Sequence, residues 1–212
     1  EWTWAEHMAA LGAPVALTMP QPGFYPRGGG TIEATVAPAK LRPARWVDRG
    51  PLLRIRGRAG VARLRPDIAE RMRRRAEARF VSAELDVDVE IDEVEWTALS
   101  PGAAIALVAE YDGLPPATFV GLGERGKPSE AVADEAVDAL LAHAQAPGGA
   151  VDPHSADQIL LPLALAEGPS EYTVSEVTEH LRTNVRTVRE FIDREITLEE
   201  SHDDGTGRVV IA

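Results

Sequence analysis

Strand-like and helix-like patterns alternate along almost the whole chain, and this order constrains the fold more than any other feature. In Thr31–Val36 every second residue is apolar, which predicts a strand exposed on one side. In Ser129–Gln145 apolar residues recur at helical spacing, which predicts a helix that buries one face. The order requires both hairpins and longer crossovers. The sequence therefore predicts an α+β fold with helices packed on sheets.

Glycine, proline and capping residues mark the ends of these elements. We expect helices at 2–11, 66–79, 129–145 and 180–192, and a further helix that is capped by Asp152 or Ser155 and runs through Leu165. We expect strands at 15–19, 31–36, 53–56, 87–94, 103–111, 117–122, 171–175, 196–200 and 208–211. Gly57 is expected to end the strand at 53–56.

Basic residues concentrate in one segment of an acidic chain. The formal net charge is −12, yet residues 42–79 hold thirteen arginines and four acidic residues, a charge of +9, so the remainder carries −21. Such a split is typical of a local nucleic-acid-binding surface. A solvated helix face whose arginines pair with acidic residues elsewhere gives the same pattern. Both interpretations stay open from the sequence.

The composition excludes several classes of site. The chain has no cysteine, which excludes disulfides, thiolate metal sites and cysteine nucleophiles. The five histidines do not form a His-x-x-x-His pair, so we expect no zinc site from this chain alone. The apolar run Ile159–Ala166 is far shorter than a membrane span of about 20 residues, and the first residues do not resemble a signal peptide. We expect a cytoplasmic protein without membrane contact.

Two loops combine glycine with basic side chains. Arg27–Gly30 could cradle a phosphate, because glycines let backbone N–H groups approach an anion. A plain β-turn is the alternative, since this segment precedes a strand rather than a helix. Gly123–Lys127 is the second loop, and a charged surface turn is its alternative.

The position of His180 singles it out among the histidines. The segment Ser175–Glu179 gives way to a helix, so the imidazole is expected in the first helical turn. Free N–H groups and a partial positive charge gather there, which favours a bound phosphate and a neutral imidazole. A neutral imidazole beside a phosphate is what nucleophilic attack on phosphorus requires.

Four segments, taken together in this order and spacing, resemble the RNA 3′-terminal phosphate cyclase family. They are Gly23–Gly30, Gly121–Gly126, Ala156–Ala166 and Thr178–Asn184. The similarity extends from about residue 20 to residue 212. The first helix is also placed as in the family.

This resemblance implies an ATP-dependent, ligase-type reaction in RNA processing. A histidine forms a covalent bond to AMP, AMP passes to an RNA 3′-phosphate, and the adjacent 2′-hydroxyl displaces it to give a 2′,3′-cyclic phosphate. The resemblance implies that His180 is the nucleophile. It implies a nucleotide pocket at His154, Ser155, Ala156, Asp157 and Gln158. Relatives usually have tyrosine at the first of these positions, and the imidazole of His154 can still stack on adenine with less area.

The resemblance also implies partners and an architecture. Magnesium or manganese is expected with ATP, without ligands from this chain. Helix-pair and four-stranded-sheet repeats are expected at 1–44 and 126–212, with a smaller inserted α/β domain at 45–125 that contains the basic helix. The family begins with a further glycine-rich repeat that this sequence lacks. We therefore expect either that this sequence is a fragment of a longer protein or that the missing repeat is a separate chain.

A non-catalytic relative of the cyclases, acting as an RNA-processing scaffold or RNA-binding protein, is the alternative. Such relatives lack the nucleophilic histidine, so the presence of His180 together with Asp157 and Gln158 favours the enzyme. His154 is the competing nucleophile because it lies in the expected pocket. Lys40 and Lys127 lie in expected loops without a neighbouring base.

Overall fold

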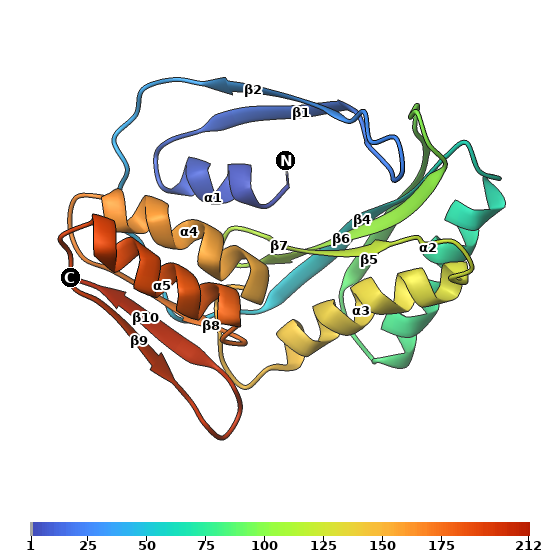
Figure 1. Cartoon of the computed structure of the whole chain (residues 1–212). Helices are drawn as coiled ribbons and strands as arrows, with labels where there is room; N and C mark the ends of the chain where they lie inside the picture. Colours follow the sequence, from blue (N-terminus) through green and yellow to red (C-terminus); the bar gives the residue numbers. More distant parts are fainter. Residues whose placement is uncertain (1) are drawn as a thin grey trace.

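A computed structural model describes residues 2–212, which form five helices, two four-stranded sheets and one two-stranded sheet (Figure 1). This architecture confirms the expected α+β class. Helix α1 (Trp4–Ala10) comes first, followed by the antiparallel strands β1 (Val15–Gln21) and β2 (Thr31–Val36). Strand β2 is exposed along its whole length, so this hairpin lies on the surface of the described residues.

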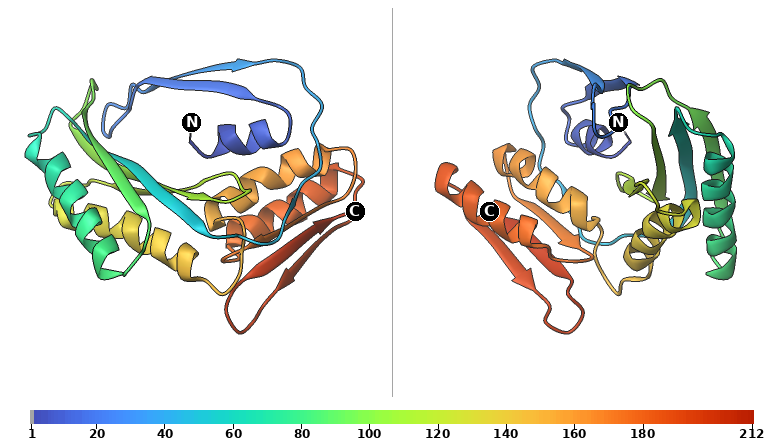
Figure 2. Two further views of the ribbon diagram at one scale, coloured as in Figure 1. Left: turned by 180° about the vertical axis from the view of Figure 1, so that it is seen from behind. Right: turned by 45° about the vertical axis from the view of Figure 1, so that its right-hand side comes forward.

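The middle of the chain forms a unit that we call the inner unit, residues 52–145. Its elements are β4 (Leu52–Ala62), α2 (Asp67–Ser82), β5 (Asp88–Glu95), β6 (Gly102–Tyr111), β7 (Ala117–Leu122) and α3 (Ser129–Gln145). The strand order is β5-β4-β6-β7, and only β4 and β5 are parallel. Helices α2 and α3 pack side by side on one face, while α1 and the hairpin lie towards the other (Figure 2).

The C-terminal unit is a helix pair on a second four-stranded sheet. Its elements are β3 (Arg45–Trp46), α4 (Pro153–Leu165), β8 (Ser170–Val174), α5 (Glu179–Phe191), β9 (Ile196–Glu200) and β10 (Gly207–Ile211). The strand order is β3-β8-β10-β9, with β3 parallel to β8 and the other neighbours antiparallel. Leu160, Leu163, Tyr172 and Leu181 are fully buried between the helices and the sheet.

Each four-stranded unit has its own hydrophobic core. The buried residues of α2 belong to the inner core and those of α5 to the C-terminal core. The expected division into 1–44 with 126–212 and 45–125 stays a prediction. In the structure, α3 contributes to the inner core although it lies after residue 125, and Trp46 contributes to the C-terminal core although it lies after residue 44.

Strand β4 is longer than the sequence predicts. Gly57 was expected to end it, and this was wrong, because the strand continues to Ala62. Both of its glycines stand where a side chain would not fit. A Cβ at Gly57 would lie 2.8 Å from the Ala106 carbonyl oxygen, and one at Gly60 would lie 2.4 Å from the Trp96 indole. Glycine here permits close packing within the strand rather than ending it.

Ion pairs neutralise most of the basic segment. Nine of its thirteen arginines pair with a carboxylate: Arg45, Arg54, Arg56, Arg65, Arg71, Arg73, Arg74, Arg75 and Arg79. Along α2 the partners come largely from α3, as in the pairs Arg71–Glu130 and Arg79–Asp138. The basic helix therefore faces an acidic helix. This favours internal pairing over a nucleic-acid surface along α2.

Candidate active site

The expected site residues lie on two neighbouring helices of the C-terminal unit. Helices α4 and α5 pack against each other on one face of the sheet (Figure 1). The Asn184 side-chain amide on α5 donates a hydrogen bond to the backbone carbonyl of Asp157 on α4, at 3.0 Å. His180 precedes Asn184 by about one turn, and His154 precedes Asp157 by about one turn. Both histidines thus lie at the N-terminal ends of adjacent helices.

Helix α4 begins with a buried carboxylate cap. Asp152 is buried, and its Oδ1 accepts hydrogen bonds from the backbone N–H groups of His154 at 3.0 Å and Ser155 at 2.9 Å. Pro153 has no N–H to offer. The first turn of α4 is therefore already bound to an anionic group. Of the two caps that the sequence allowed, Asp152 is the one that the structure uses.

The five expected pocket residues divide by exposure. His154 and Gln158 are exposed, Asp157 is half-buried, and Ser155 and Ala156 are buried. The Ala156 carbonyl accepts a 2.8 Å hydrogen bond from the Tyr172 hydroxyl. Burial, with a smaller contribution from the Asp157 carboxylate, raises the pKa of Tyr172. Ala156 thus holds α4 on its sheet and Ser155 is buried at the cap, which leaves His154, Asp157 and Gln158 to reach a ligand.

His180 is the second residue of α5, as the sequence predicts. Thr178 caps this helix, since its Oγ1 accepts from the Leu181 N–H at 3.1 Å. The backbone N–H groups of Glu179 and His180 donate to no acceptor within residues 2–212. The His180 imidazole is exposed and makes no hydrogen bond to another described residue. An exposed imidazole and two available N–H donors thus share one helical turn.

The approach to α5 is fixed by the turn between β9 and β10. The Val177 N–H donates to the Gly205 carbonyl at 2.9 Å. A Cβ at Gly207 would lie 2.3 Å from the Val177 side chain, so only glycine permits this contact. Arg182, two residues after His180, pairs with Glu200 at 2.7 Å and Glu179 at 2.5 Å. These carboxylates raise the pKa of Arg182 and neutralise its charge.

A buried polar contact behind α5 was not found by sequence reasoning. His143 Nδ1 lies 2.8 Å from the Ser175 hydroxyl, and Ser175 comes three residues before the Thr178 cap. Burial is the main cause that lowers the pKa of His143 to about 4. The Arg49 guanidinium donates to five carbonyls at the end of α3 and in the following loop: those of His143, Ala144, Ala146, Gly148 and Gly149. The inner unit is thereby tied to the segment that leads into α5.

The two glycine-containing loops lie away from α4 and α5. Gly23–Gly30 is the connection between β1 and β2, and it docks on the start of β6: the Arg27 N–H donates to Ser100 Oγ at 3.2 Å. A Cβ at Gly102 would lie 2.1 Å from the Phe24 ring, so the ring rests directly on this glycine. Gly121 likewise lets α3 approach β7, because its Cβ would lie 2.0 Å from the Val132 carbonyl oxygen.

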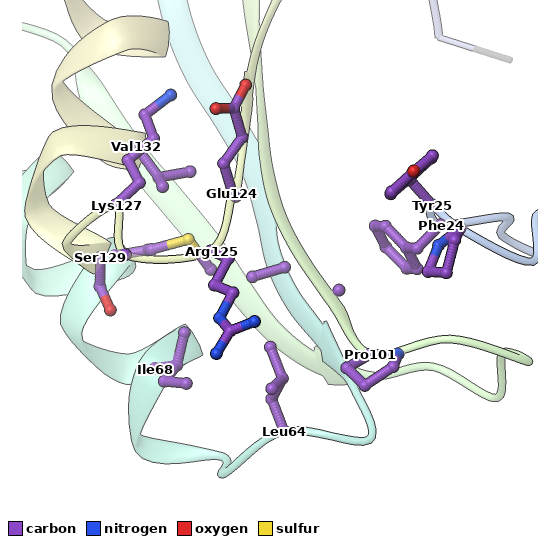
Figure 3. Close-up of a pocket in the computed structure, with 16 residues that line it drawn as sticks. Phe24, Tyr25, Leu64, Ile68, Pro101, Glu124, Arg125, Lys127, Ser129 and Val132 are labelled. Atoms are coloured by element: carbon purple, nitrogen blue, oxygen red, sulfur yellow. The ribbon is translucent and has the colours of Figure 1, made fainter.

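A cavity of about 930 Å³ lies between these loops, and we call it the turn cavity (Figure 3). A second cavity of about 340 Å³ lies between α1, Trp46 and the turn from β6 to β7. Neither of these two cavities is lined by His180, His154 or Asp157. Residues 2–212 contain no group of three His, Cys, Asp or Glu side chains placed to hold a metal ion.

Comparison with known sequences shows the family to which the chain belongs. Residues 1–198 match the family described as RNA 3′-terminal phosphate cyclase. The chain belongs to this family. The match confirms the resemblance inferred from the four segments. The matched residues include helices α4 and α5, and the name of the family describes chemistry at a terminal phosphate.

Several curated cyclases are similar to the chain. The RNA 3′-terminal phosphate cyclase of Pyrobaculum neutrophilum is 36% identical over 201 residues, which cover 94% of this chain and 57% of the relative. That of Methylococcus capsulatus is 40% identical over 190 residues, covering 89% and 52%. That of Ralstonia nicotianae is 34% identical over 210 residues, covering 98% and 58%. The chain spans about half the length of the curated cyclases that it matches. Among residues 2–212, no helix is both long and apolar enough to cross a membrane.

Proposed function

We propose that this chain belongs to an enzyme that uses ATP to convert an RNA 3′-phosphate into a 2′,3′-cyclic phosphate. Membership in the cyclase family supports the reaction class. The observation that carries the assignment of the nucleophile is the first turn of α5. There the exposed His180 imidazole stands beside two backbone N–H groups without acceptors in the described residues.

In the first step a ring nitrogen of His180 attacks the α-phosphorus of ATP. The new N–P bond forms while the bond from the α-phosphorus to the bridging oxygen breaks, and pyrophosphate leaves with that oxygen. The proton on the other ring nitrogen passes to water. The N–H groups of Glu179 and His180 stabilise the charge on the α-phosphate oxygens, with the partial positive charge of the helix end.

In the second step an oxygen of the RNA 3′-phosphate attacks the phosphorus of the histidine-bound AMP. The N–P bond breaks, and the released ring takes a proton from water, which regenerates the neutral His180 imidazole. The RNA 2′-hydroxyl then attacks the 3′-phosphorus and loses its proton, and AMP leaves. In this scheme His154 stacks on the adenine, and the side chains of Asp157 and Gln158 hold the nucleoside. A divalent cation would offset the charge of the polyphosphate. We assign it no residue, because residues 2–212 hold no ligand cluster.

The test compares two histidines in a protein that contains this chain and the remaining length of the cyclase family. The unaltered protein, incubated with α-labelled ATP, should become labelled through a bond that is acid-labile and alkali-stable, as a phosphoramidate is. His180→Asn should abolish the label, and His154→Ala should only weaken it. Label that persists in His180→Asn contradicts the assignment. Label lost only in His154→Ala moves the nucleophile there, and no label in the unaltered protein favours the non-catalytic alternative.

A further inference from the structure

The turn cavity has an aromatic side and an apolar floor. The connection between β1 and β2 supplies Phe24 and Tyr25, and α2 with its preceding loop supplies Leu64 and Ile68 from the other side (Figure 3). Its volume of about 930 Å³ lies within the range of small-ligand pockets in proteins. None of its lining residues belongs to α4 or α5, so it is separate from the candidate active site.

Tyr25 presents an exposed ring on a firmly held turn. Its side chain is 92% exposed, which is unusual for so large an aromatic residue. The neighbouring Phe24 rests on Gly102 and lies 6.2 Å from the Trp96 ring, and the backbone of Arg27 is bonded to Ser100. The turn is thus anchored to the inner sheet while the Tyr25 ring stays free. An exposed ring on an anchored backbone is the arrangement on which a nucleic-acid base stacks.

A guanidinium group without a carboxylate partner in the described residues lines the same cavity. Arg125 reaches into it from the loop between β7 and α3, and it pairs with no acidic residue within 2–212 (Figure 3). Arg27 and Arg63 adjoin the lining residues Pro26 and Leu64 in the sequence, and they too have no carboxylate partner in the described chain. Two further charged groups line the cavity: Lys127, which pairs with Glu135 at 2.5 Å, and the carboxylate of Glu124.

Arg125 differs in this respect from most basic residues of the described chain. Twelve of the 22 basic residues pair with a carboxylate, as nine of the thirteen arginines in the basic segment do. The turn cavity brings the unpaired Arg125 guanidinium and the exposed Tyr25 ring to one place. A guanidinium group binds a phosphate, and an exposed aromatic ring is a surface on which a base stacks.

We propose that the turn cavity binds one nucleotide of a single-stranded RNA, with its base on Tyr25 and its phosphate at Arg125. The occupant is a strand rather than a duplex, because a paired base would first have to be unpaired and unstacked, at a cost in free energy, before it could enter a cavity. The inference rests on the proposed function only in that an RNA end is the substrate. A strand whose 3′ end lies at His180 would have this nucleotide at an internal position.

The test measures binding of a labelled single-stranded RNA of about ten nucleotides with a 3′-hydroxyl end, by fluorescence anisotropy with the 212-residue chain. Tyr25→Ala should weaken binding about tenfold, and Tyr25→Phe should retain it, because the ring remains. Arg125→Gln should weaken binding and reduce the salt dependence of log K by about 0.7, the contribution of one single-strand phosphate contact. Arg74→Gln is the matched control, since it removes an exposed arginine of α2 outside the cavity.

A cross-linking measurement does not depend on variants that fold. An RNA that carries 4-thiouridine should cross-link under ultraviolet light to the peptide that contains Phe24 and Tyr25. The proposal is overturned if the unaltered chain does not bind, if Tyr25→Ala binds normally, or if Arg74→Gln loses as much as Arg125→Gln. Equal competition by a duplex also overturns it. The 3′-hydroxyl RNA cannot be cyclised and the assay contains no ATP, so failure here is distinct from failure of His180 to take up label.

Discussion

At the scale of single residues, two aspartates near the start of α4 are expected to have different roles, one in stability and one in ligand binding. Asp152 is buried and holds two N–H groups of the first turn, whereas the half-buried Asp157 side chain has no hydrogen-bond partner in the described residues. We expect Asp152→Ala to lower the free energy of unfolding by about 1–2 kcal/mol through loss of the cap. We expect Asp157→Asn to leave the melting temperature unchanged and to weaken labelling by α-labelled ATP.

Thermal unfolding followed by circular dichroism, together with label uptake per folded molecule, checks both aspartates. A melting temperature that falls in Asp157→Asn while label uptake stays normal would make Asp157 structural.

Protonation of His143 should make stability depend on pH. Burial lowers its pKa from 6.5 to about 4, so between these values the unfolded chain binds a proton at this residue and the folded chain does not. The stabilisation is complete above pH 6.5 and is lost as the pH falls, by up to about 1.4 kcal/mol per unit. Burial also lowers the pKa of His7, which acts in the same direction.

Urea unfolding between pH 7 and pH 5 measures the contribution of His143. In this range carboxylates are ionised in both states, because their ordinary pKa values are about 4. His143→Gln keeps a partner for Ser175 and should give a shallower pH dependence than the unaltered chain, with the part due to His7 remaining. Equal slopes in the two proteins would show that His143 does not titrate in this way.

The sequence predicts some of these residues and not others, for a physical reason. The position of His180 follows from a local signal, the change from the segment Ser175–Glu179 to a helical pattern. That Ser155 is buried depends on how α4 lies on its sheet. The contact between His143 and Ser175 joins residues 32 positions apart and has no local signature. The cavity at Tyr25 likewise exists only because a hairpin turn docks on a strand of another unit.

At the scale of elements, Arg49 closes the end of α3. Its guanidinium donates to five carbonyls at the end of α3 and in the following loop, where a helix has too few N–H donors for its last carbonyls. Arg49→Lys keeps the charge but cannot span this set, because an ammonium group lacks the planar fork. We expect it to lower the free energy of unfolding by about 2 kcal/mol. Arg74→Lys, on the exposed side of α2, should change it little.

Chemical denaturation of the two lysine variants gives the difference directly. Equal stabilities would mean that water satisfies these carbonyls as well as Arg49 does. At this scale the sequence pattern predicts the bounds of some elements and not of others. The bounds of α3 agree with its periodicity. Strand β4 runs past Gly57, because its glycines are needed for close packing against Ala106 and Trp96, which lie elsewhere in the sequence.

At the scale of the whole molecule, the packing of Phe24 on Gly102 is one of the contacts that join the N-terminal hairpin to the inner unit. Phe24 covers Gly102, where any Cβ would overlap the ring. We expect Gly102→Ala to release the turn, so that a protease cleaves within residues 23–30 far faster and single-stranded RNA binds more weakly. Gly148→Ala is the control, because its Cβ would meet open space. Equal cleavage rates in both variants would mean that the turn stays docked without this contact.

The α+β class follows from the alternation of patterns, but the arrangement of two cores does not. Helix α3 lies on the inner sheet because its apolar face meets β6 and β7 and its acidic face meets the arginines of α2. No local pattern states which of two sheets a helix joins. The charge split alone likewise does not distinguish a nucleic-acid-binding surface from internal ion pairs. The distinction depends on the acidic side chains of α3, which pair with arginines of α2.

The parallel pairing of β3 with β8 has a consequence for the order of synthesis. Arg45 and Glu171 are 126 residues apart, and the whole inner unit lies between them. Joining such distant segments in an unfolded chain has a large loop-closure cost, which falls when the intervening residues are already compact. During synthesis on the ribosome the inner unit is complete once Gln145 has emerged. Trp46 can pair with β8 only after Tyr172 has also emerged. The nascent chain therefore carries Trp46 without its β8 neighbour until Tyr172 has emerged.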